Sequence, residues 1–293
     1  MSNKPTFSLI GAGAAGTALA LALSRQGYRA TAIASRSQAS AEHCATLVDC
    51  DISTTDPLFA ARSADIVIIA TPDGQIKGVC DKIAETGGFS VQQTVIHLSG
   101  AAGASVLGSA KNAGAATLSF HPIQTLSDPQ KGAELLIGAY YCLEGDQRAI
   151  EQIEPLVSDL QGTALIIDEK NKALYHAALC VASNYLVVLE DIAVRFLEQA
   201  GIERESALKA LLPLVQGGVD NLRHSGLPQA LTGPISRGDS STISVHLQAM
   251  EKMPERSVLL YKLLGQEAIE LAQQKGNISP AAAESIQAML STE

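Results

Sequence analysis

Short apolar runs alternate with segments of helical periodicity throughout residues 1–168. Runs of strand length occupy residues 7–10, 29–34, 64–70, 94–98, 116–120, 139–143 and 164–167. Helical patterns lie between them, for example at 38–47, 56–61 and 146–160. Continuous apolar runs of this length are typical of strands covered on both faces of a parallel sheet. The alternation therefore predicts a doubly wound, mainly parallel α/β sheet of seven or eight strands.

The pattern changes after residue 168, where no further strand is evident. Helical periodicity covers residues 170–200, 204–217 and 258–275. A polar, glycine-rich loop at 230–239 separates the last two of these segments. We therefore predict an α/β domain at residues 1–168 and an all-helical domain at 169–293. A loop of this kind inside a helical domain usually carries function or is disordered.

The first apolar run leads into a glycine turn, Gly11-Ala12-Gly13-Ala14-Ala15-Gly16. Gly11 allows a tight exit from the strand, Gly13 admits a pyrophosphate close to the backbone, and Gly16 lets the following helix approach the strand. The free amides of the turn and of the helix start, including those of Ala14 and Ala15, would hold the diphosphate. The fold class predicted is therefore Rossmann-type. The rival interpretation of residues 4–24, a secretory signal peptide, is disfavoured by the three glycines and the strand that follows.

The end of the second strand indicates which dinucleotide is bound. An acidic side chain there would bind the ribose hydroxyls of NAD, whereas a 2′-phosphate requires cations and hydroxyls. The chain has Ser35, Arg36 and Ser37 at this position and no carboxylate. A guanidinium can stack on adenine and contact phosphate. We therefore predict NADP in preference to NAD; the alternative is that Arg36 is an ordinary solvated cation.

Composition and charge restrict the class of partner. The 293 residues are 46% hydrophobic and 17% charged, with a formal net charge of −9. That charge argues against nucleic acid or an anionic membrane surface as a partner. Five dispersed cysteines without a C-x-x-C pair are typical of a reduced, cytoplasmic protein, and the six dispersed histidines suggest no metal site. The apolar segment 173–189 contains His176, Ser183 and Asn184, and we predict a buried helix rather than a membrane span.

Polar residues follow three of the predicted strands. Because the carboxyl ends of parallel strands face the ligand crevice, Thr71 and Pro72 should line the cofactor, as should Ser99, which is also placed to meet substrate. His121, held by Pro122 at the end of its strand, could serve as an acid or base beside a nicotinamide. The alternative for His121 is a wall or capping residue.

The long helical segment carries a polar stripe. In an ideal α-helix Lys172, His176, Ser183 and Glu190 share one face, with Asn184 on a neighbouring face. There Lys172 could protonate a carbonyl oxygen and Asn184 could orient the carbonyl. The alternatives are a solvated lysine and a hydrogen-bonded core histidine. In the glycine-rich loop, Thr232 and Arg237 are candidates to bind a substrate carboxylate, unless Arg237 pairs with Asp239.

The chain resembles a family of predicted oxidoreductases that join a Rossmann-like domain to a helical domain of unassigned function. The motifs that carry the resemblance are the glycine turn at 11–16, HLSGA at 97–101, SFHP at 119–122, KALYHAA at 172–178 with ASN at 182–184, and LTGPISRGD at 231–239. More distantly the chain is similar to β-hydroxyacid dehydrogenases, ketopantoate reductases and pyrroline-carboxylate reductases. The first two groups imply acid–base roles for Lys172 and Asn184, although the asparagine spacing differs from that of ketopantoate reductases.

A further resemblance concerns the His-Pro turn. It is similar to the catalytic histidine region of prephenate and arogenate dehydrogenases, which implies a role for His121, but the glycine-rich continuation of those enzymes is missing. The resemblances imply an NADP-dependent reductase of a small keto or hydroxy acid, ketopantoate-like in its specific form, and a homodimer. The alternatives are a prephenate-like dehydrogenase that uses His121 and a nucleotide-binding regulator without turnover.

Overall fold

The structure is a computed structural model that describes residues 4–291. The chain divides into two compact units, Met1–Ala182 and Ser183–Glu293. This division lies inside the long helical segment, whereas the change in composition places it at residue 168. The difference arises because the first turns of that segment pack into the sheet unit, where the Lys172 side chain is 2% exposed.

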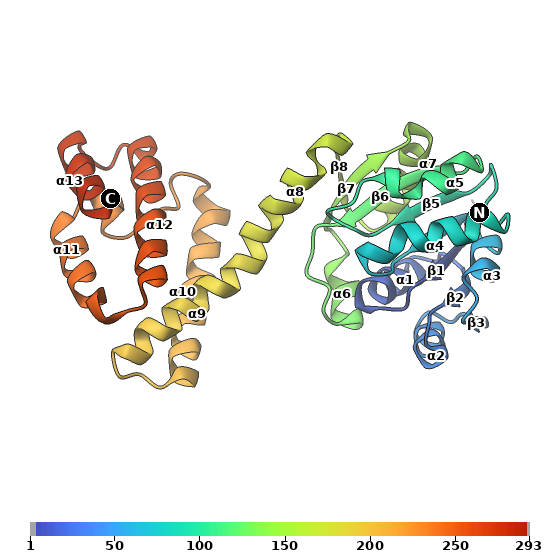
Figure 1. Cartoon of the computed structure of the whole chain (residues 1–293), viewed down its shortest axis with the longest axis horizontal. Coiled ribbons are helices and arrows are strands. Elements are labelled where there is room, and N and C mark those ends of the chain that lie inside the picture. The colour runs from blue at the N-terminus through green and yellow to red at the C-terminus, as the bar shows by residue number, and fades with distance from the viewer. Residues whose placement is uncertain (1–3, 292–293) are drawn as a thin grey trace. The chain divides into compact units, whose positions relative to one another are not determined.

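An eight-stranded sheet forms the centre of the first unit, with the order β3-β2-β1-β4-β5-β6-β7-β8 (Figure 1). The strands are β1 (Phe7–Ile10), β2 (Ala30–Ala34), β3 (Ser53–Thr54), β4 (Ile66–Ile69), β5 (Thr94–His97), β6 (Ala116–Pro122), β7 (Tyr140–Gly145) and β8 (Thr163–Ile166). Neighbouring strands are parallel except for β6 and β7, which are antiparallel. The predicted mainly parallel, doubly wound sheet is therefore confirmed. The apolar runs indicated the strands, but a run by itself carries no information about strand direction.

Helices cover both faces of this sheet. They are α1 (Ala14–Arg25), α2 (Gln38–Leu47), α3 (Pro57–Arg62), α4 (Asp73–Glu85), the 3₁₀ turn Ala104–Leu107 with α5 (Gly108–Asn112), α6 (Pro129–Leu135) and α7 (Gln147–Asp159). One apolar cluster joins α1, α2, α6 and α7 to one face of the sheet, and a second joins α3, α4 and α5 to the other. Burial on both faces explains why the strands are continuous apolar runs.

Local sequence signals determine where several of these helices begin. The Asp56 carboxylate accepts a hydrogen bond from the Leu58 amide, with Pro57 in the first turn, and Ser37 accepts from the Ser40 amide. These are the N-cap contacts expected of aspartate and serine. By contrast, α1 begins at Gly13 without any side-chain cap. The first amides of α1 therefore remain available to a ligand.

The second unit is helical. It contains α9 (Tyr185–Gln199), α10 (Arg204–Ser225), α11 (Ser240–Ala249), α12 (Glu255–Lys275) and α13 (Pro280–Leu290), with short 3₁₀ turns at Ile235–Arg237 and Met250–Lys252. Helices α9 and α10 pack on each other, and α11, α12 and α13 enclose a small core around Ile243, Ile269 and Ile286. The prediction of an all-helical second region is confirmed. Helices α11 and α13 lay outside the predicted segments.

The long apolar helical segment is not the buried helix that the sequence predicts. It begins with the 3₁₀ turn Glu169–Asn171 and α8 (Lys172–Leu179), continues as a π-helical turn at Cys180–Asn184, and ends with α9. By length and composition the stretch Glu169–Gln199 could cross a membrane, yet only 6% of its apolar window is buried. Leu174 and Val187 are more than 70% exposed. Few of the apolar side chains of this segment are covered by the rest of the chain. The predicted homodimer and the predicted absence of a membrane partner stay predictions.

Candidate functional site

The glycine turn is shaped by contacts that exclude larger residues. Gly11 has φ +111°, and a Cβ there would lie 2.6 Å from the Ala70 carbonyl oxygen at the end of β4. A Cβ on Gly16 would lie 2.5 Å from the Gly11 carbonyl oxygen. Gly13 differs, because a Cβ there meets no protein atom within 4 Å. Gly11 and Gly16 are thus required by the fold, whereas Gly13 leaves open space next to the uncapped start of α1.

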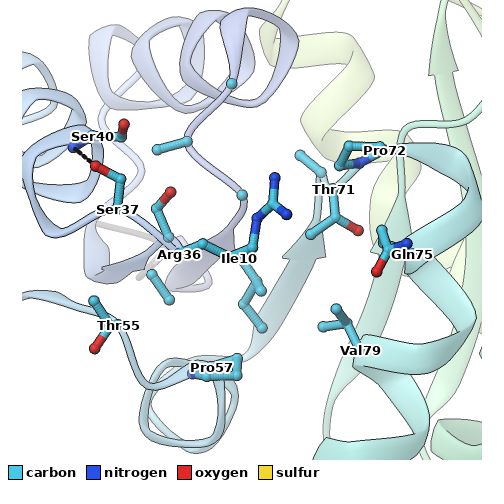
Figure 2. A pocket seen from close by; sticks show the side chains of 16 residues that line it. Ile10, Arg36, Ser37, Ser40, Thr55, Pro57, Thr71, Pro72, Gln75 and Val79 are labelled. Carbon is cyan, nitrogen blue, oxygen red and sulfur yellow. Dashed lines mark hydrogen bonds between the residues drawn. The ribbon is translucent and has the colours of Figure 1, made fainter.

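A cavity of about 360 Å³ opens beside this turn. It is lined by Ile10, Gly11, Ala12, Gly13, Ala34, Ser35, Arg36, Ser37, Ser40, Thr55, Pro57, Ala70, Thr71, Pro72, Gln75 and Val79. Figure 2 shows Ser37 and Ser40 at one side and Thr71 and Gln75 at the other, with Arg36 between them. A guanidinium, several hydroxyls and free helix amides could together hold an anionic nucleotide.

One residue that lines this cavity carries a buried polar atom with no partner among the described residues. The Thr71 hydroxyl is inaccessible to solvent and makes no hydrogen bond. An orphaned buried hydroxyl costs about 1–3 kcal/mol unless a ligand satisfies it. Thr71 follows β4, and the cavity spans the carboxyl ends of β1, β2 and β4, where a doubly wound sheet binds its ligand. The residues present therefore fit a dinucleotide.

The structure brings most of the predicted cofactor residues to this cavity. Those that line it are Gly11, Gly13, Ser35, Arg36, Ser37, Thr71 and Pro72. Ala14, Ala15, Gly16 and Ser99 are not among the lining residues. Sequence reasoning missed Thr55 and Pro57, which follow the two-residue strand β3, because so short a strand leaves no apolar run. It also missed Gln75 and Val79, whose spacing of four residues on α4 was the available signal.

A second group of polar residues surrounds Lys172. Its Nζ donates to Ser119 Oγ at 2.8 Å and to the Ser99 carbonyl oxygen at 3.4 Å. These acceptors lie within β6 and just after β5, so the lysine bridges two neighbouring strands. Burial lowers the pKa of the Lys172 ammonium, while Cys142, Glu144 and Asp73 act in the opposite direction. One of its three N–H groups has no partner among the described groups, which leaves a donor for a ligand.

Ser99 is held by the start of α4. Its hydroxyl donates to the Asp73 carboxylate at 2.7 Å and accepts from the Ala102 amide at 3.0 Å. His97 braces the same turn, because its Nδ1 accepts from the Ser99 amide and its Nε2 lies 3.1 Å from the Gly103 carbonyl oxygen. Burial lowers the pKa of His97 to about 4. The neutral imidazole thus ties together the two ends of the turn that carries Ser99.

His121 lies beside Lys172 in the same group. Its Nδ1 is 2.7 Å from the hydroxyl of Tyr175 on α8, and its ring meets the Tyr175 ring edge to face. Burial, followed by the charge of Lys172, lowers the pKa of His121 to about 4. His176 also lies close, with its ring centroid 6.5 Å from that of His121. The structure therefore brings together Lys172, His121, His176 and Ser99, and it adds Tyr175, which sequence reasoning missed.

Two family models match this chain. A Rossmann-like domain matches residues 3–122, and a domain of unknown function (DUF2520) matches residues 139–268. The chain joins a Rossmann-like domain to a DUF2520 domain. His121 lies in the first match and Lys172 and Tyr175 in the second, so the cluster is built from both. No curated protein matches the sequence.

Solved structures share this fold. A candidate NADP oxidoreductase from Bacteroides fragilis is 23% identical, with 91% of this chain and 98% of that chain covered and a TM-score of 0.73. A pyrroline-5-carboxylate reductase from Coxiella burnetii is 18% identical, with 99% and 100% covered and a TM-score of 0.63. A reductive aminase from Aspergillus terreus, solved with NADPH and ethyl-5-oxohexanoate, is 16% identical, with 98% and 93% covered and a TM-score of 0.59. At these identities the likeness establishes the fold.

The remaining predicted residues lie in the DUF2520 match, in the second compact unit. Thr232 and Arg237 are exposed in the loop before α11. Lys275 holds this loop, since its Nζ donates to the Leu231 carbonyl oxygen at 2.8 Å. Asp239 does not pair with Arg237; its carboxylate instead accepts from Ser241 Oγ and from the amide and hydroxyl of Thr242 at the start of α11. The alternative interpretation of Arg237 as the salt-bridge partner of Asp239 is therefore wrong.

The predicted polar stripe does not continue along the helical segment. The π-helical turn at Cys180–Asn184 contains more residues per turn than an α-helix. Residues within and beyond this turn are rotated relative to their ideal α-helical positions. Ser183 and Glu190 therefore no longer share one helix face with Lys172. Asn184, the predicted carbonyl-orienting residue, is exposed at the end of the π turn. The π turn also rotates Asn184 away from its ideal α-helical position relative to Lys172.

Proposed function

We propose that this protein is an NADP-dependent reductase that transfers hydride to the carbonyl carbon of a small keto acid. The observation that carries the proposal is the cavity at the carboxyl ends of β1, β2 and β4, which combines uncapped helix amides, Arg36 and the orphaned Thr71 hydroxyl. When bound there, NADPH would supply the hydride. The solved structures with this fold include proteins named as NADP oxidoreductases and an NADPH complex, which supports the cofactor.

The cluster around Lys172 supplies the second part of the proposal. Lys172 has a lowered pKa and a free N–H, and it lies beside β6 and the end of β5, on the same edge of the sheet as the cavity. A lysine of this kind can donate a proton to a carbonyl oxygen as charge develops on it. Asn184, Thr232 and Arg237 belong to the second unit, and their predicted roles toward the substrate stay predictions.

A second candidate is reduction of a C=N bond. It is favoured by the names of the solved structures, which include imine reductases, a reductive aminase and a pyrroline-5-carboxylate reductase. In both reactions the hydride is transferred to carbon. The two candidates differ in the atom that takes up the proton, which is oxygen in a carbonyl and nitrogen in an imine. NADPH consumption measured with matched panels of 2-keto acids, 3-keto acids and cyclic imines separates them. If no compound in any panel is turned over although NADPH binds tightly, the remaining hypothesis is a nucleotide-binding regulator without turnover.

The coenzyme preference gives a direct test of Arg36. We expect Arg36→Ala to lower the ratio of NADPH to NADH affinity by about 10- to 100-fold, because charge-assisted hydrogen bonds contribute about 1.5–3 kcal/mol. Fluorescence titration with each reduced coenzyme measures the ratio. Arg62 offers a matched control, since its guanidinium donates to the Thr86 carbonyl oxygen away from the cavity. An unchanged ratio in Arg36→Ala would remove Arg36 from the 2′-phosphate site.

The first two glycines of the turn should respond differently to the same methyl group. We expect Gly11→Ala to destabilise the first unit by about 3 kcal/mol, because alanine is strained at φ +111° and its Cβ would strike the Ala70 carbonyl. We expect Gly13→Ala to change stability by less than about 1 kcal/mol and to raise the NADPH dissociation constant at least about tenfold, because its Cβ projects into ligand space. Denaturant unfolding and NADPH titration of both variants check this. Equal effects of the two variants on folding would contradict it.

A further inference from the structure

The hydrogen bond between Tyr175 and His121 determines where the imidazole carries its proton. The Tyr175 hydroxyl lies 2.7 Å from His121 Nδ1, and the Cys142 thiol is its second polar neighbour. Burial raises the pKa of Tyr175, so its hydroxyl keeps its proton. A half-buried phenol donates to the stronger acceptor within its reach, and an imidazole nitrogen accepts more strongly than a thiol sulfur. His121 Nδ1 is then the acceptor, and the proton of the neutral ring lies on Nε2.

The groups around His121 keep the imidazole neutral. Lys172 and His176 lie on α8, and His97 precedes the turn beside it; all three lower the His121 pKa, after the larger effect of burial. Asp73, at the start of α4, acts in the opposite direction but does not cancel them. The ring therefore lacks the second proton that it would need to act as an imidazolium acid near neutral pH.

The protonated nitrogen lies against the backbone of Gly100. A Cβ placed on Gly100 would lie 2.8 Å from His121 Nε2 and 2.8 Å from His176 Cδ2. Both imidazoles thus pack closely against Gly100, and a side chain at position 100 could not fit without moving them. His121 Nε2 has no hydrogen-bond partner among the described residues. Nε2 is not among the orphaned atoms that solvent cannot reach, so a ligand atom has access to this unpaired donor and can complete its hydrogen bond.

We propose that His121 binds the substrate as a neutral hydrogen-bond donor through Nε2–H, and that Tyr175 is a positioning residue that sets this tautomer. This inference rests on the proposed reductase function and narrows its substrate class. A carbonyl oxygen has lone pairs that accept this bond, whereas an iminium nitrogen carries a proton and has none. The donor therefore suits a carbonyl oxygen, polarised by Nε2–H while Lys172 remains the proton source, and excludes a protonated iminium as the bound form.

The tautomer can be measured without any turnover. In the full chain labelled with ¹⁵N-histidine, the signals lost in His121→Asn identify His121. We expect wild-type His121 to carry its proton on Nε2 and to titrate below pH 5. In Tyr175→Phe, which keeps the ring and removes the hydroxyl, we expect a substantial Nδ1–H population. A purely structural role for Tyr175 would lower stability and leave the tautomer unchanged, and that result, or an Nδ1–H wild-type ring, would overturn the proposal.

Turnover of the best keto acid provides the second arm of the test. We expect His121→Gln, whose amide places an N–H near the position of Nε2, to stay within about tenfold of wild-type kcat/KM. His121→Asn, whose shorter amide reaches the position of Nδ1, should lose at least about a hundredfold, and Tyr175→Phe about tenfold. If the His121→Gln and His121→Asn variants are equally inactive, His121 acts as an acid or base and the proposal fails. If no substrate turns over at all, the reductase function fails, and the tautomer measurement still decides the role of Tyr175.

Discussion

Replacing Lys172 with methionine should lower kcat/KM by about 10³-fold while leaving the protein folded. The lysine is 2% exposed, and its Nζ is bound to Ser119 Oγ and the Ser99 carbonyl oxygen. Loss of a positioned proton donor typically costs about 10²- to 10⁴-fold in rate. Methionine has a similar shape and removes the cost of burying the charge, so the unfolding free energy should change by less than about 2 kcal/mol.

Two further variants complete this test. Lys170→Met is the matched control, because Lys170 lies two residues away, is highly exposed and pairs with Asp168 on the surface. It should retain wild-type kcat/KM. Lys172→Arg keeps the positive charge but donates protons poorly, since a guanidinium is not deprotonated in proteins. A rate for Lys172→Arg near that of Lys172→Met would assign the lysine to proton transfer, whereas recovery of activity would assign it to charge alone. Undiminished turnover in Lys172→Met would remove it from the mechanism.

Acid should destabilise the first unit well before its carboxylates are protonated. His97 and His121 each have a folded-state pKa of about 4, against an ordinary value of 6.5. Between these pH values the two histidines are protonated in the unfolded chain but not in the folded chain. Stability is therefore full above about pH 6.5, falls as the pH drops toward 4, and stops falling from this cause below 4. The loss approaches about 3 kcal/mol for each histidine.

Other groups act in different pH ranges or in the opposite direction. Asp81 and Asp146 have lowered pKa values, so they contribute to acid destabilisation mainly below the histidine window. Glu144 opposes the histidines, because burial raises its pKa and the folded state gains a proton there. The slope of stability against pH between 4 and 6.5 is thus the diagnostic quantity.

Hydrogen exchange measures this slope in the relevant unit. Peptides from β5 and β6 should lose protection as the pH falls from 6.5 to 4, once the intrinsic pH dependence of exchange is removed. His97→Asn and His121→Asn should each flatten the slope by about one proton. His43→Asn, on the exposed side of α2, is the control and should leave the slope unchanged. If the stability of the wild type does not change between pH 6.5 and 4, neither histidine is held neutral by the fold.

The cofactor end of the molecule was largely predictable from local patterns. The glycine turn follows an apolar run and precedes a helix, and that order alone places it at the carboxyl end of β1. Arg36 and Thr71 could be placed because each directly follows a predicted strand, and the carboxyl ends of parallel strands meet at one edge of a sheet. Thr55 and Pro57 could not be placed in this way, since the two residues of β3 form no pattern.

The second cluster was predictable only in part. Lys172, His121 and Ser99 were singled out one at a time, and both Lys172 and His121 had a structural alternative. Their meeting depends on how α8 packs against β6 and the end of β5, which periodicity does not encode. Tyr175 was overlooked because a tyrosine on a helix has no signature until its hydroxyl is seen against an imidazole.

The sequence by itself determined the doubly wound sheet, the helical second region, the glycine turn and the chemistry that follows β2. Those features depend on short-range patterns, because burial on two faces and close backbone approach dictate residue type within a few positions. Only the tertiary structure decided that Lys172 is buried, that His121 faces Gly100 with Tyr175 behind it, and that a π turn interrupts the polar stripe. These depend on contacts between residues more than 20 positions apart or on backbone geometry, and neither leaves a periodic trace in the chain.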